Sequence, residues 1–393
     1  MAWMTLYLLS GLLYLALIAG AEPASPPVEL VAVPNAGIQP QAVMDERGVL
    51  HLIYFKGEPG SGDLFYVRRP AGATTFSAPI RVNSEQGSAI AAGTVRGGQI
   101  ALGRGGWVHV VWNAAKPIDR PPPRTRIGGT RNSVPQTPMW YARLPPGAGA
   151  FEPQRAIGEH TRHLDGGGSI AADARGRVYV VWHAAGLKDG EIDRRIYVAR
   201  SADDGRRFGS EEAFALEGGL CGCCQLETLA QVDGRLQILY RAAGGGVHRD
   251  AMWLTVGPKG AQPPVRLQEW NLPACPMTTF AMAVAPSGIL AAWETQHQIY
   301  AATLDPARRT ASNVAALAGT AIRKHPSMAV NKAGERLIAW TEGTAWARGG
   351  TVAWELQDRD GVRLAGAVNA GSVPIWGLVS AIANPDGSFM IVR

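Results

Sequence analysis

The feature that most constrains the fold is a short pattern that recurs along the chain. Each copy has an apolar strand, a tight turn rich in Gly, Asp or Asn, and a second apolar strand that usually ends at an aromatic residue. Two copies read IAADARGRVYVVW (170–182) and AMAVAPSGILAAW (281–293). All seven copies lie at residues 41–55, 100–112, 170–182, 228–241, 281–293, 327–340 and 380–393. Alternating strands of this length, with no sustained helical period, predict an all-β protein.

Further strands follow most copies of the pattern. A third strand has an aromatic near its middle, as in IYVARS, and a weaker fourth strand such as APIRVN comes next. Four-stranded units that repeat every ~45–70 residues are typical of a β-propeller. We therefore expect a β-propeller of seven four-stranded blades, with six blades as the alternative. The last copy leaves no room for outer strands, so VELVAV (28–33) is expected to close the ring with strands from both termini.

The N-terminal region reads as a targeting segment ahead of one folded domain at 28–393. An apolar run at 5–18 precedes Ala19-Gly20-Ala21, a small-residue cleavage pattern, which predicts a signal peptide at 1–21 and a proline-rich leader at 22–27. No Lys or Arg precedes the run, so an uncleaved anchor is the alternative, although the run is short for a membrane span. We expect a periplasmic or secreted protein that contacts a membrane only through an uncleaved anchor.

The charge pattern argues against one class of partner. The net charge is +6 and arises mostly from arginine, which suits planar anions such as carboxylates. No basic run contains interleaved aromatic residues, so we expect no nucleic-acid binding. The expected partner is a carbohydrate or another small anionic ligand, and the protein is expected to be a monomer.

One hairpin links the pattern to a known superfamily. The stretch VARSADDGRRFGSEE contains Ser201, Asp203, Gly205 and Phe208 in the order of an Asp box, a turn in which the serine and aspartate bond the backbone. Its position after a third strand resembles the sialidase-like propellers. The segments HLDGGGSIAAD, CGCC, VHRD and CPMTT with AAWET also resemble a group of exported bacterial propellers labelled sialidase-like. Both resemblances imply a propeller fold, and the second implies no settled activity.

Propeller geometry then sorts the polar residues by face. First strands begin at one face, here called the upper face, and the connections between second and third strands return to it. Six residues are expected to bind a ligand there: Arg96, His183, Arg241, His248, Arg249 and His325. Three acidic residues are candidates for catalysis: Asp165, Asp250 and Glu294. A long loop at 113–140 adds Arg120, Arg124, Arg126 and Arg131, either as a cationic rim or as a solvated insertion.

Four cysteines allow three interpretations. Cys221, Cys223 and Cys224 precede the first strand of one blade, and Cys275 precedes that of the next, so we expect them to lie close together. Export favours two disulfides, one joining Cys275 to the cluster and one within it, where Cys221 pairs with Cys223 or Cys224 because a bond between adjacent cysteines is strained. The alternatives are a copper(I) or zinc site completed by a histidine such as His248 or His325, and a redox-active pair. No other cofactor is expected.

The sequence leaves the activity open. The sialidase resemblance implies an arginine triad, a tyrosine nucleophile backed by a glutamate, and an acid/base aspartate. This chain has AGIQPQAVMDERG where that family has its Arg-Ile-Pro signature. The tyrosines that we assign to strands, rather than to the upper face, are Tyr66, Tyr141, Tyr179, Tyr197, Tyr240 and Tyr300. We therefore expect an upper-face pocket that binds or processes a carbohydrate or anionic ligand without true sialidase activity. The alternatives are a metal-binding or redox protein and a non-catalytic envelope scaffold.

Overall fold

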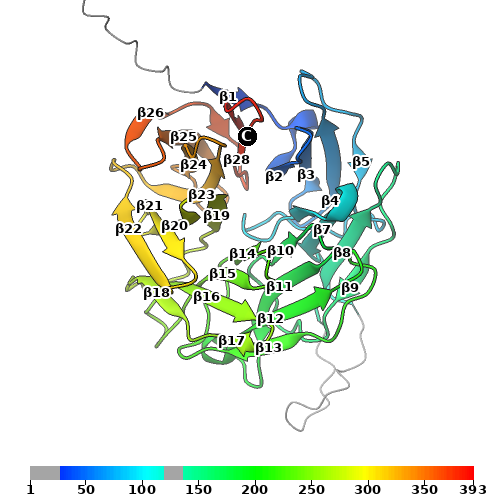
Figure 1. Ribbon diagram of the computed structural model, residues 1–393. Coiled ribbons are helices and arrows are strands. Elements are labelled where there is room, and N and C mark those ends of the chain that lie inside the picture. Colours follow the sequence, from blue (N-terminus) through cyan, green and yellow to red (C-terminus); the bar gives the residue numbers. More distant parts are fainter. Residues whose placement is uncertain (1–26, 119–135) are drawn as a thin grey trace, which may run out of the picture.

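The computed structural model describes residues 27–118 and 136–393, in which seven β-sheets form a ring (Figure 1). The signal peptide, almost all of the proline-rich leader and the four arginines of the long loop lie outside the described residues. The only helical segments within the described ranges are three short 3-10 turns: η1 (Pro34–Ala36), η2 (Arg104–Gly106) and η3 (Glu191–Asp193). No helix in this part of the chain is long and apolar enough to cross a membrane.

Each of the first six blades starts with an inner strand and proceeds outward. Blade one contains β2 (Ile38–Met44), β3 (Leu50–Glu58), β4 (Ser61–Arg69) and β5 (Ile80–Arg81). Blade two contains β6 (Gln99–Leu102), β7 (Val108–Asn113), β8 (Met139–Leu144) and β9 (Arg155–Ile157). Blade three contains β10 (Ser169–Ala172), β11 (Val178–Ala185), β12 (Arg194–Ser201) and β13 (Glu212–Ala215).

The next three blades follow the same order, and two of them carry a fifth short strand. Blade four contains β14 (Glu227–Ala230), β15 (Leu236–Arg241), β16 (Ala251–Gly257), β17 (Gly260–Ala261) and β18 (Val265–Gln268). Blade five contains β19 (Phe280–Ala285), β20 (Gly288–Thr295), β21 (Gln298–Asp305) and β22 (Thr310–Ala316). Blade six contains β23 (Arg323–Val330), β24 (Arg336–Glu342), β25 (Gly350–Gln357), β26 (Arg363–Ala367) and β27 (Ser372–Val373).

The seventh blade joins the two ends of the described chain. It consists of β28 (Ser380–Ala383), β29 (Phe389–Val392) and β1 (Val28–Val31), which lie side by side in Figure 1. Strand β1 runs parallel to β29, with Val28 opposite Phe389. The Arg393 N–H donates to the carbonyl oxygen of Val31 (2.9 Å), which continues the pairing beyond the strand. The expected seven blades and their closure by both termini are thus confirmed, and the closing blade has three strands rather than four.

Apolar side chains are buried between neighbouring blades on both faces of each sheet. Seven separate apolar clusters occupy the seven gaps between blades, which explains why the second strands read as nearly continuous apolar runs. The aromatic residues that end these runs are central to the clusters, as Trp112, Trp182 and Trp293 are at most 1% exposed. This packing fixes the inner strands around the central channel.

Candidate functional site

The inner strands place one residue each at the same register position around the channel. These residues are Gln41, Gln99, Ser169, Glu227, Ala281, Ser327 and Ser380, and each faces an apolar residue of the second strand in its own blade. All seven line a cavity of about 240 Å³. Five of the seven inner strands begin at or next to this position, so the cavity lies at the upper mouth of the channel. We call these seven residues the channel ring.

Three members of the channel ring hold neighbouring blades together. The hydroxyl of Ser169 accepts a hydrogen bond from the Thr228 N–H (3.1 Å), one residue beyond the ring position of the next blade. The hydroxyls of Ser327 and Ser380 likewise accept hydrogen bonds from the N–H groups of Ala381 (2.9 Å) and Ala42 (3.2 Å), respectively. These serine hydroxyls are therefore occupied by the backbone and have a structural role.

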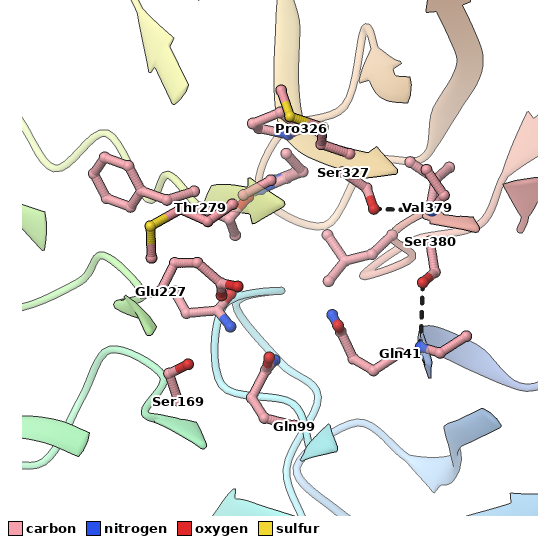
Figure 2. Close-up of a pocket in the computed structure, with 18 of the residues that line it drawn as sticks. Gln41, Gln99, Ser169, Glu227, Thr279, Pro326, Ser327, Val379 and Ser380 are labelled. Atoms are coloured by element: carbon pink, nitrogen blue, oxygen red, sulfur yellow. Dashed lines mark hydrogen bonds between the residues drawn. The ribbon is translucent and has the colours of Figure 1, made fainter. Parts of the chain in front are cut away.

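The other polar members present unoccupied groups to the cavity. Within the described residues, the side chains of Gln41, Gln99 and Glu227 make no hydrogen bond or ion pair. Figure 2 shows their amide and carboxyl groups pointing into the same space from different blades. Burial raises the pKa of Glu227 from 4.5 to about 8, because no cation or hydrogen-bond donor in the described part of the chain compensates its charge. Glu227 is therefore mainly protonated at neutral pH and can both donate and accept a hydrogen bond.

Two residues at the rim extend this polar surface. Gln225 lines the cavity, and its backbone N–H donates to the carbonyl oxygen of Thr278 (3.1 Å). His325 also lines the cavity, is 4% exposed and has a buried Nδ1 with no hydrogen-bond partner among the described residues. Burial lowers the pKa of His325 far below its usual value, so its imidazole is neutral. His325 is the one member of the nine predicted ligand-binding and catalytic residues that borders this cavity.

The three arginines that were expected to bind a ligand each have partners within the protein. Arg96 is hydrogen-bonded and ion-paired to Asp165 at the surface. Arg241 is 1% exposed and donates to the Thr278 hydroxyl (3.2 Å) and to backbone carbonyl oxygens, including that of Arg249 (2.7 Å). The guanidinium of Arg249 is bonded to a carboxylate oxygen of Glu191 (2.6 Å). These contacts leave no group of arginines converging on an open pocket.

The two remaining acidic candidates are also committed to partners. Glu294 is fully buried, and its carboxylate lies 3.2 Å from Lys324 Nζ and 3.4 Å from His297 Nδ1. The carboxylate of Asp250 accepts a hydrogen bond from the Trp270 N–H (3.0 Å). Neither Asp165, Glu294 nor Asp250 lines the channel cavity.

The two other predicted histidines have different positions. His183 is 1% exposed, and its Nδ1 accepts from Arg194 (3.2 Å) while its Nε2–H donates to the Cys224 carbonyl oxygen (2.8 Å). Burial lowers the pKa of His183 to about 3, so this neutral ring positions the cysteine loop rather than a ligand. His248 is exposed, and its backbone pairs with residues 244 and 271.

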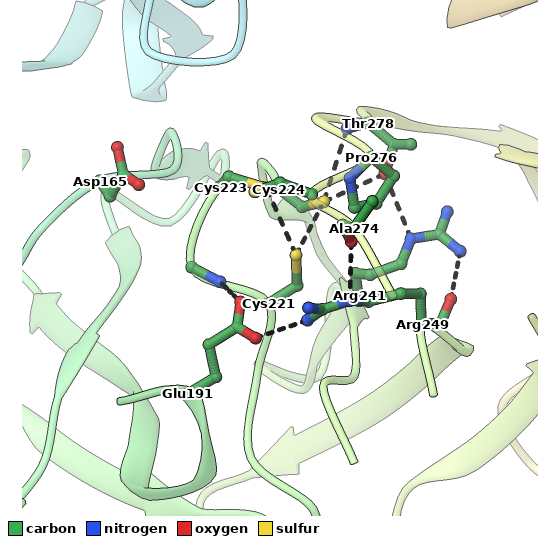
Figure 3. The surroundings of a disulfide bond; sticks show 12 residues. Asp165, Glu191, Cys221, Cys223, Cys224, Arg241, Arg249, Ala274, Pro276 and Thr278 are labelled. Atoms are coloured by element: carbon green, nitrogen blue, oxygen red, sulfur yellow. Dashed lines mark hydrogen bonds and ion pairs between the residues drawn. A yellow bond between two sulfur atoms is a disulfide. The ribbon is translucent and has the colours of Figure 1, made fainter. Parts of the chain in front are cut away.

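The cysteines form one disulfide, where two were expected. Cys223 is bonded to Cys275, whereas Cys221 and Cys224 are buried thiols (Figure 3). The Cys221 sulfur lies 3.5 Å from the sulfurs of both Cys223 and Cys224, beyond bonding distance of each. Three sulfur atoms lie within 4.8 Å of one another, as a metal site would require. One of them, that of Cys223, is already used by the disulfide, and exposed His248 is not part of the group.

The expected structural residues occupy strands and turns. The hydroxyl of Ser201 donates to Asp203 (2.8 Å) and accepts from the Gly205 N–H (3.1 Å) in the turn between β12 and β13. Phe208 packs edge-on against Tyr141 at 5.0 Å between ring centroids. Every tyrosine in the described ranges lies in a strand, and none lines the channel cavity.

The sequence analysis missed the channel ring because it examined loops and not strand starts. A usable signal was present. Aligning the repeats places a polar residue at this position in six of the seven copies, as in QAVM (41–44), QIAL (99–102) and ETLA (227–230). Among these six residues Glu227 is the only acid, and it would have stood out in such an alignment. The supporting residues Glu191, Arg194 and Thr278 carry no sequence signal that identifies their role.

Comparison with known proteins supports the fold. No protein-family model matches the sequence. No curated protein matches it either. Among solved structures, a protein of unknown function from Dyadobacter fermentans has a TM-score of 0.55 at 13% identity, over 86% of this chain and 99% of that chain.

Two enzymes of known type are similar in structure. The NanB sialidase of Streptococcus pneumoniae has a TM-score of 0.54 at 7% identity, over 78% of this chain. The match spans 65% of the sialidase, less than two thirds of its length. The α-L-arabinanase of Penicillium chrysogenum, solved with arabinobiose, has a TM-score of 0.54 at 11% identity, over 84% of this chain and 95% of that chain. At such low identity the likeness concerns the fold alone, and the chain is a seven-bladed β-propeller whose fold is similar to that of these proteins.

Proposed function

We propose that the protein binds a small neutral carbohydrate at the upper mouth of its central channel. The observation that carries the proposal is Glu227, a carboxyl group inside the cavity with no partner among the described residues. A protonated carboxyl and the amides of Gln41 and Gln99 each offer a donor and an acceptor, which suits the hydroxyl groups of a sugar. A buried polar group without a partner costs roughly 1–3 kcal/mol, and a ligand that supplied the missing hydrogen bonds would recover part of this cost.

The composition of the cavity favours a neutral ligand over an anion. The described residues that line it include no lysine and no arginine, so a carboxylate or phosphate would lose its hydration without gaining a cation. A volume of about 240 Å³ is below the ~300–1,000 Å³ typical of clefts for drug-sized ligands, which favours one or two sugar rings. The arabinobiose held by the similarly folded arabinanase supports a sugar of this size.

The same composition favours binding over hydrolysis. Most glycoside hydrolases use two carboxyl groups roughly 5–10 Å apart, and sialidases use a tyrosine instead. Glu227 is the single acidic residue in the described lining of the cavity, and that lining contains no tyrosine. We therefore propose that the ligand is held and released unchanged.

Calorimetric titration of the purified protein tests this proposal. L-Arabinobiose and D-galactose serve as neutral probes, and N-acetylneuraminic acid serves as the anionic probe. We expect a neutral probe to bind and Glu227→Ala to weaken its binding at least tenfold. The matched control is Glu46→Gln, because Glu46 is exposed in the turn that follows the inner strand of blade one. Binding of the anionic probe alone, or equal affinity in Glu227→Ala, would contradict the proposal.

We also propose that the chain is exported and loses residues 1–21. The apolar run and the small residues that follow it support this assignment. Cell fractionation followed by N-terminal mass analysis should find a chain that starts at Glu22 in the periplasm or medium. A membrane-bound chain that retains Met1 would favour the uncleaved anchor.

A further inference from the structure

The cysteine cluster holds two thiols in contact with a disulfide that reaches the surface. The Cys221 sulfur is 3.5 Å from the sulfurs of both Cys223 and Cys224, and all three sulfurs lie within 4.8 Å of one another. Cys221, Cys223 and Cys224 are 1–6% exposed, whereas Cys275, the partner of Cys223, is an exposed residue. The sulfurs of Cys221, Cys223 and Cys224 form one buried group (Figure 3), which the disulfide links to the exposed residue Cys275.

The surroundings of Cys224 favour its thiolate. The Thr278 hydroxyl donates to the Cys224 sulfur (3.4 Å) and itself accepts a hydrogen bond from buried Arg241 (3.2 Å). The Thr278 N–H also points to this sulfur (3.5 Å). Burial alone would raise the pKa of Cys224, but the hydrogen bond with Cys221, the charge of Arg241 and the Thr278 contacts outweigh it and lower the pKa. Thiolates, and not thiols, are the nucleophiles of disulfide exchange.

The loop that carries the cluster is held on several sides. Glu191 accepts a hydrogen bond from the Gly222 N–H (2.8 Å) and is ion-paired with Arg249 (2.6 Å). His183 bonds the Cys224 carbonyl oxygen, as described above. The Gly222 carbonyl oxygen accepts from the Gly166 N–H (2.7 Å). The close approach of the sulfurs is thus built into the fold, since partners in blades three and four hold both ends of the loop.

We propose that the four cysteines form a thiol–disulfide relay through which the Cys221/Cys224 dithiol reduces an external disulfide at Cys275. The observation behind the proposal is that the Cys221 sulfur lies 3.5 Å both from the other buried thiol and from the disulfide that ends at the exposed residue Cys275. This relay lies at a different site from the proposed sugar cavity, because none of the four cysteines lines that cavity. The class of substrate is a disulfide on a small molecule or on an exposed segment of another protein.

The first half of the relay opens the surface disulfide. The Cys224 thiolate takes the proton of Cys221, and the Cys221 sulfur attacks that of Cys223. The Cys221–Cys223 bond forms, the Cys223–Cys275 bond breaks, and Cys275 leaves as a thiolate. The Cys275 thiolate then attacks the external disulfide, which gives a mixed disulfide on Cys275 and releases the first external thiol, with its proton taken from solvent.

The second half restores the surface disulfide. Cys224 releases its proton to solvent, which supplies the proton of the second external thiol. Cys224 then attacks Cys221, so the Cys221–Cys224 bond forms and Cys223 leaves as a thiolate. Cys223 attacks Cys275 in the mixed disulfide, which reforms the Cys223–Cys275 bond and releases the second external thiol. The two electrons come from Cys221 and Cys224, and the external disulfide is reduced to two thiols. Each attack on Cys221 or Cys223 uses a sulfur pair that already lies 3.5 Å apart.

The experiment uses the full mature chain. Dithiothreitol is added until alkylation of the denatured protein detects two thiols per chain. Oxidised glutathione is then added as the external disulfide. We expect two glutathione molecules to be released per chain, with Cys221–Cys224 and Cys223–Cys275 bonds in the peptide map. Cys224→Ser should release one glutathione and retain the other on Cys275, because no thiol remains to free Cys223. Cys275→Ser should slow glutathione release at least tenfold, since the remaining sulfurs are buried.

A measurement on the wild-type chain covers the case in which a variant does not fold. Native alkylation of the two-thiol protein with iodoacetamide should label Cys275, because exchange transfers a free thiol to it. Labelling restricted to Cys221 and Cys224 would overturn the relay, as would equal rates of glutathione release in Cys275→Ser. Native mass spectrometry could instead detect copper or zinc bound to the protein, with both thiols unreactive toward oxidised glutathione. That result would also overturn the relay and would identify the cluster as a metal site.

Discussion

Cys224 and Glu227 lie three positions apart on one segment that runs from the cysteine cluster to the channel wall. Gln225, between them, lines the channel cavity and donates its backbone N–H to the carbonyl oxygen of Thr278 (3.1 Å). Thr278 in turn contacts the Cys224 sulfur (3.4 Å). The two candidate sites are therefore separate in their chemistry but share a backbone segment.

This shared segment predicts that oxidation of the thiols changes sugar affinity. A bond between Cys221 and Cys224 draws their sulfurs from 3.5 Å to roughly 2 Å, which displaces the backbone next to Gln225. We expect the dissociation constant for L-arabinobiose to change about threefold, or ~0.6 kcal/mol, between the two redox states. Calorimetry on both states measures the difference. In Cys221→Ser, which can form neither this bond nor the Cys221–Cys223 bond of the relay, the oxidant should leave the affinity unchanged.

The raised pKa of Glu227 predicts a pH-dependent stability. The folded chain keeps this proton up to about pH 8, whereas an unfolded chain releases it near pH 4.5, so the folded state binds more protons between these values. The free energy of unfolding should therefore fall as the pH rises through this window. Glu227→Gln removes the titration, so denaturant unfolding should find that its stability relative to wild type rises with pH by up to ~1.4 kcal/mol per pH unit within this window. Parallel curves for the two proteins would show that Glu227 ionises normally.

The contact of Thr278 with Cys224 predicts a shift in thiol titration. Thr278→Val preserves the shape of the side chain but removes the hydroxyl that donates to the sulfur and accepts from Arg241. The pKa of Cys224, which its surroundings lower in the wild type, should rise by about one unit, visible as a later onset of thiolate absorbance with pH. The matched control is Thr295→Val, because the buried hydroxyl of Thr295 has no partner in the described residues. An equal shift in both variants would rule out a specific role for Thr278.

The serines of the channel ring predict an effect on stability without an effect on binding. Ser380→Ala removes the acceptor for the Ala42 N–H (3.2 Å), a contact between blades seven and one. Loss of this hydrogen bond should reduce the free energy of unfolding by about 1 kcal/mol in chemical denaturation. The affinity for L-arabinobiose should stay within about twofold of wild type, and a larger loss would mean that the hydroxyl also contacts the ligand.

The fold was predictable because its determinants are local and repeated. Aromatic residues such as Trp112 and Trp182 end the second strands, and burial between blades requires them at that position in copy after copy. The closing strand at Val28 was predictable because the last copy lacked outer strands and an unused strand remained near the start of the described chain. Both inferences needed only the count and spacing of strands.

The site was less predictable because it depends on the direction of individual side chains. Arg241 ends β15 and was expected to face a ligand at the upper face. Its guanidinium is instead buried against Trp270, with the Arg241 Cζ atom 5.1 Å from the centroid of the Trp270 ring. Glu227 begins β14 and looks like an ordinary strand residue until the register of the inner strands places it in the channel. A sequence gives the alternation along one strand, but the partners of a buried charge come from other blades.

A crystal structure of the protein soaked with L-arabinobiose tests the central claim most directly. The account predicts electron density for a sugar at the upper mouth of the channel, with its hydroxyl groups within hydrogen-bonding distance of Gln41, Gln99 and the Glu227 carboxyl. Density for the sugar at another surface, such as that around Asp165 and Arg96, or a channel mouth without sugar at saturating concentration, would contradict it.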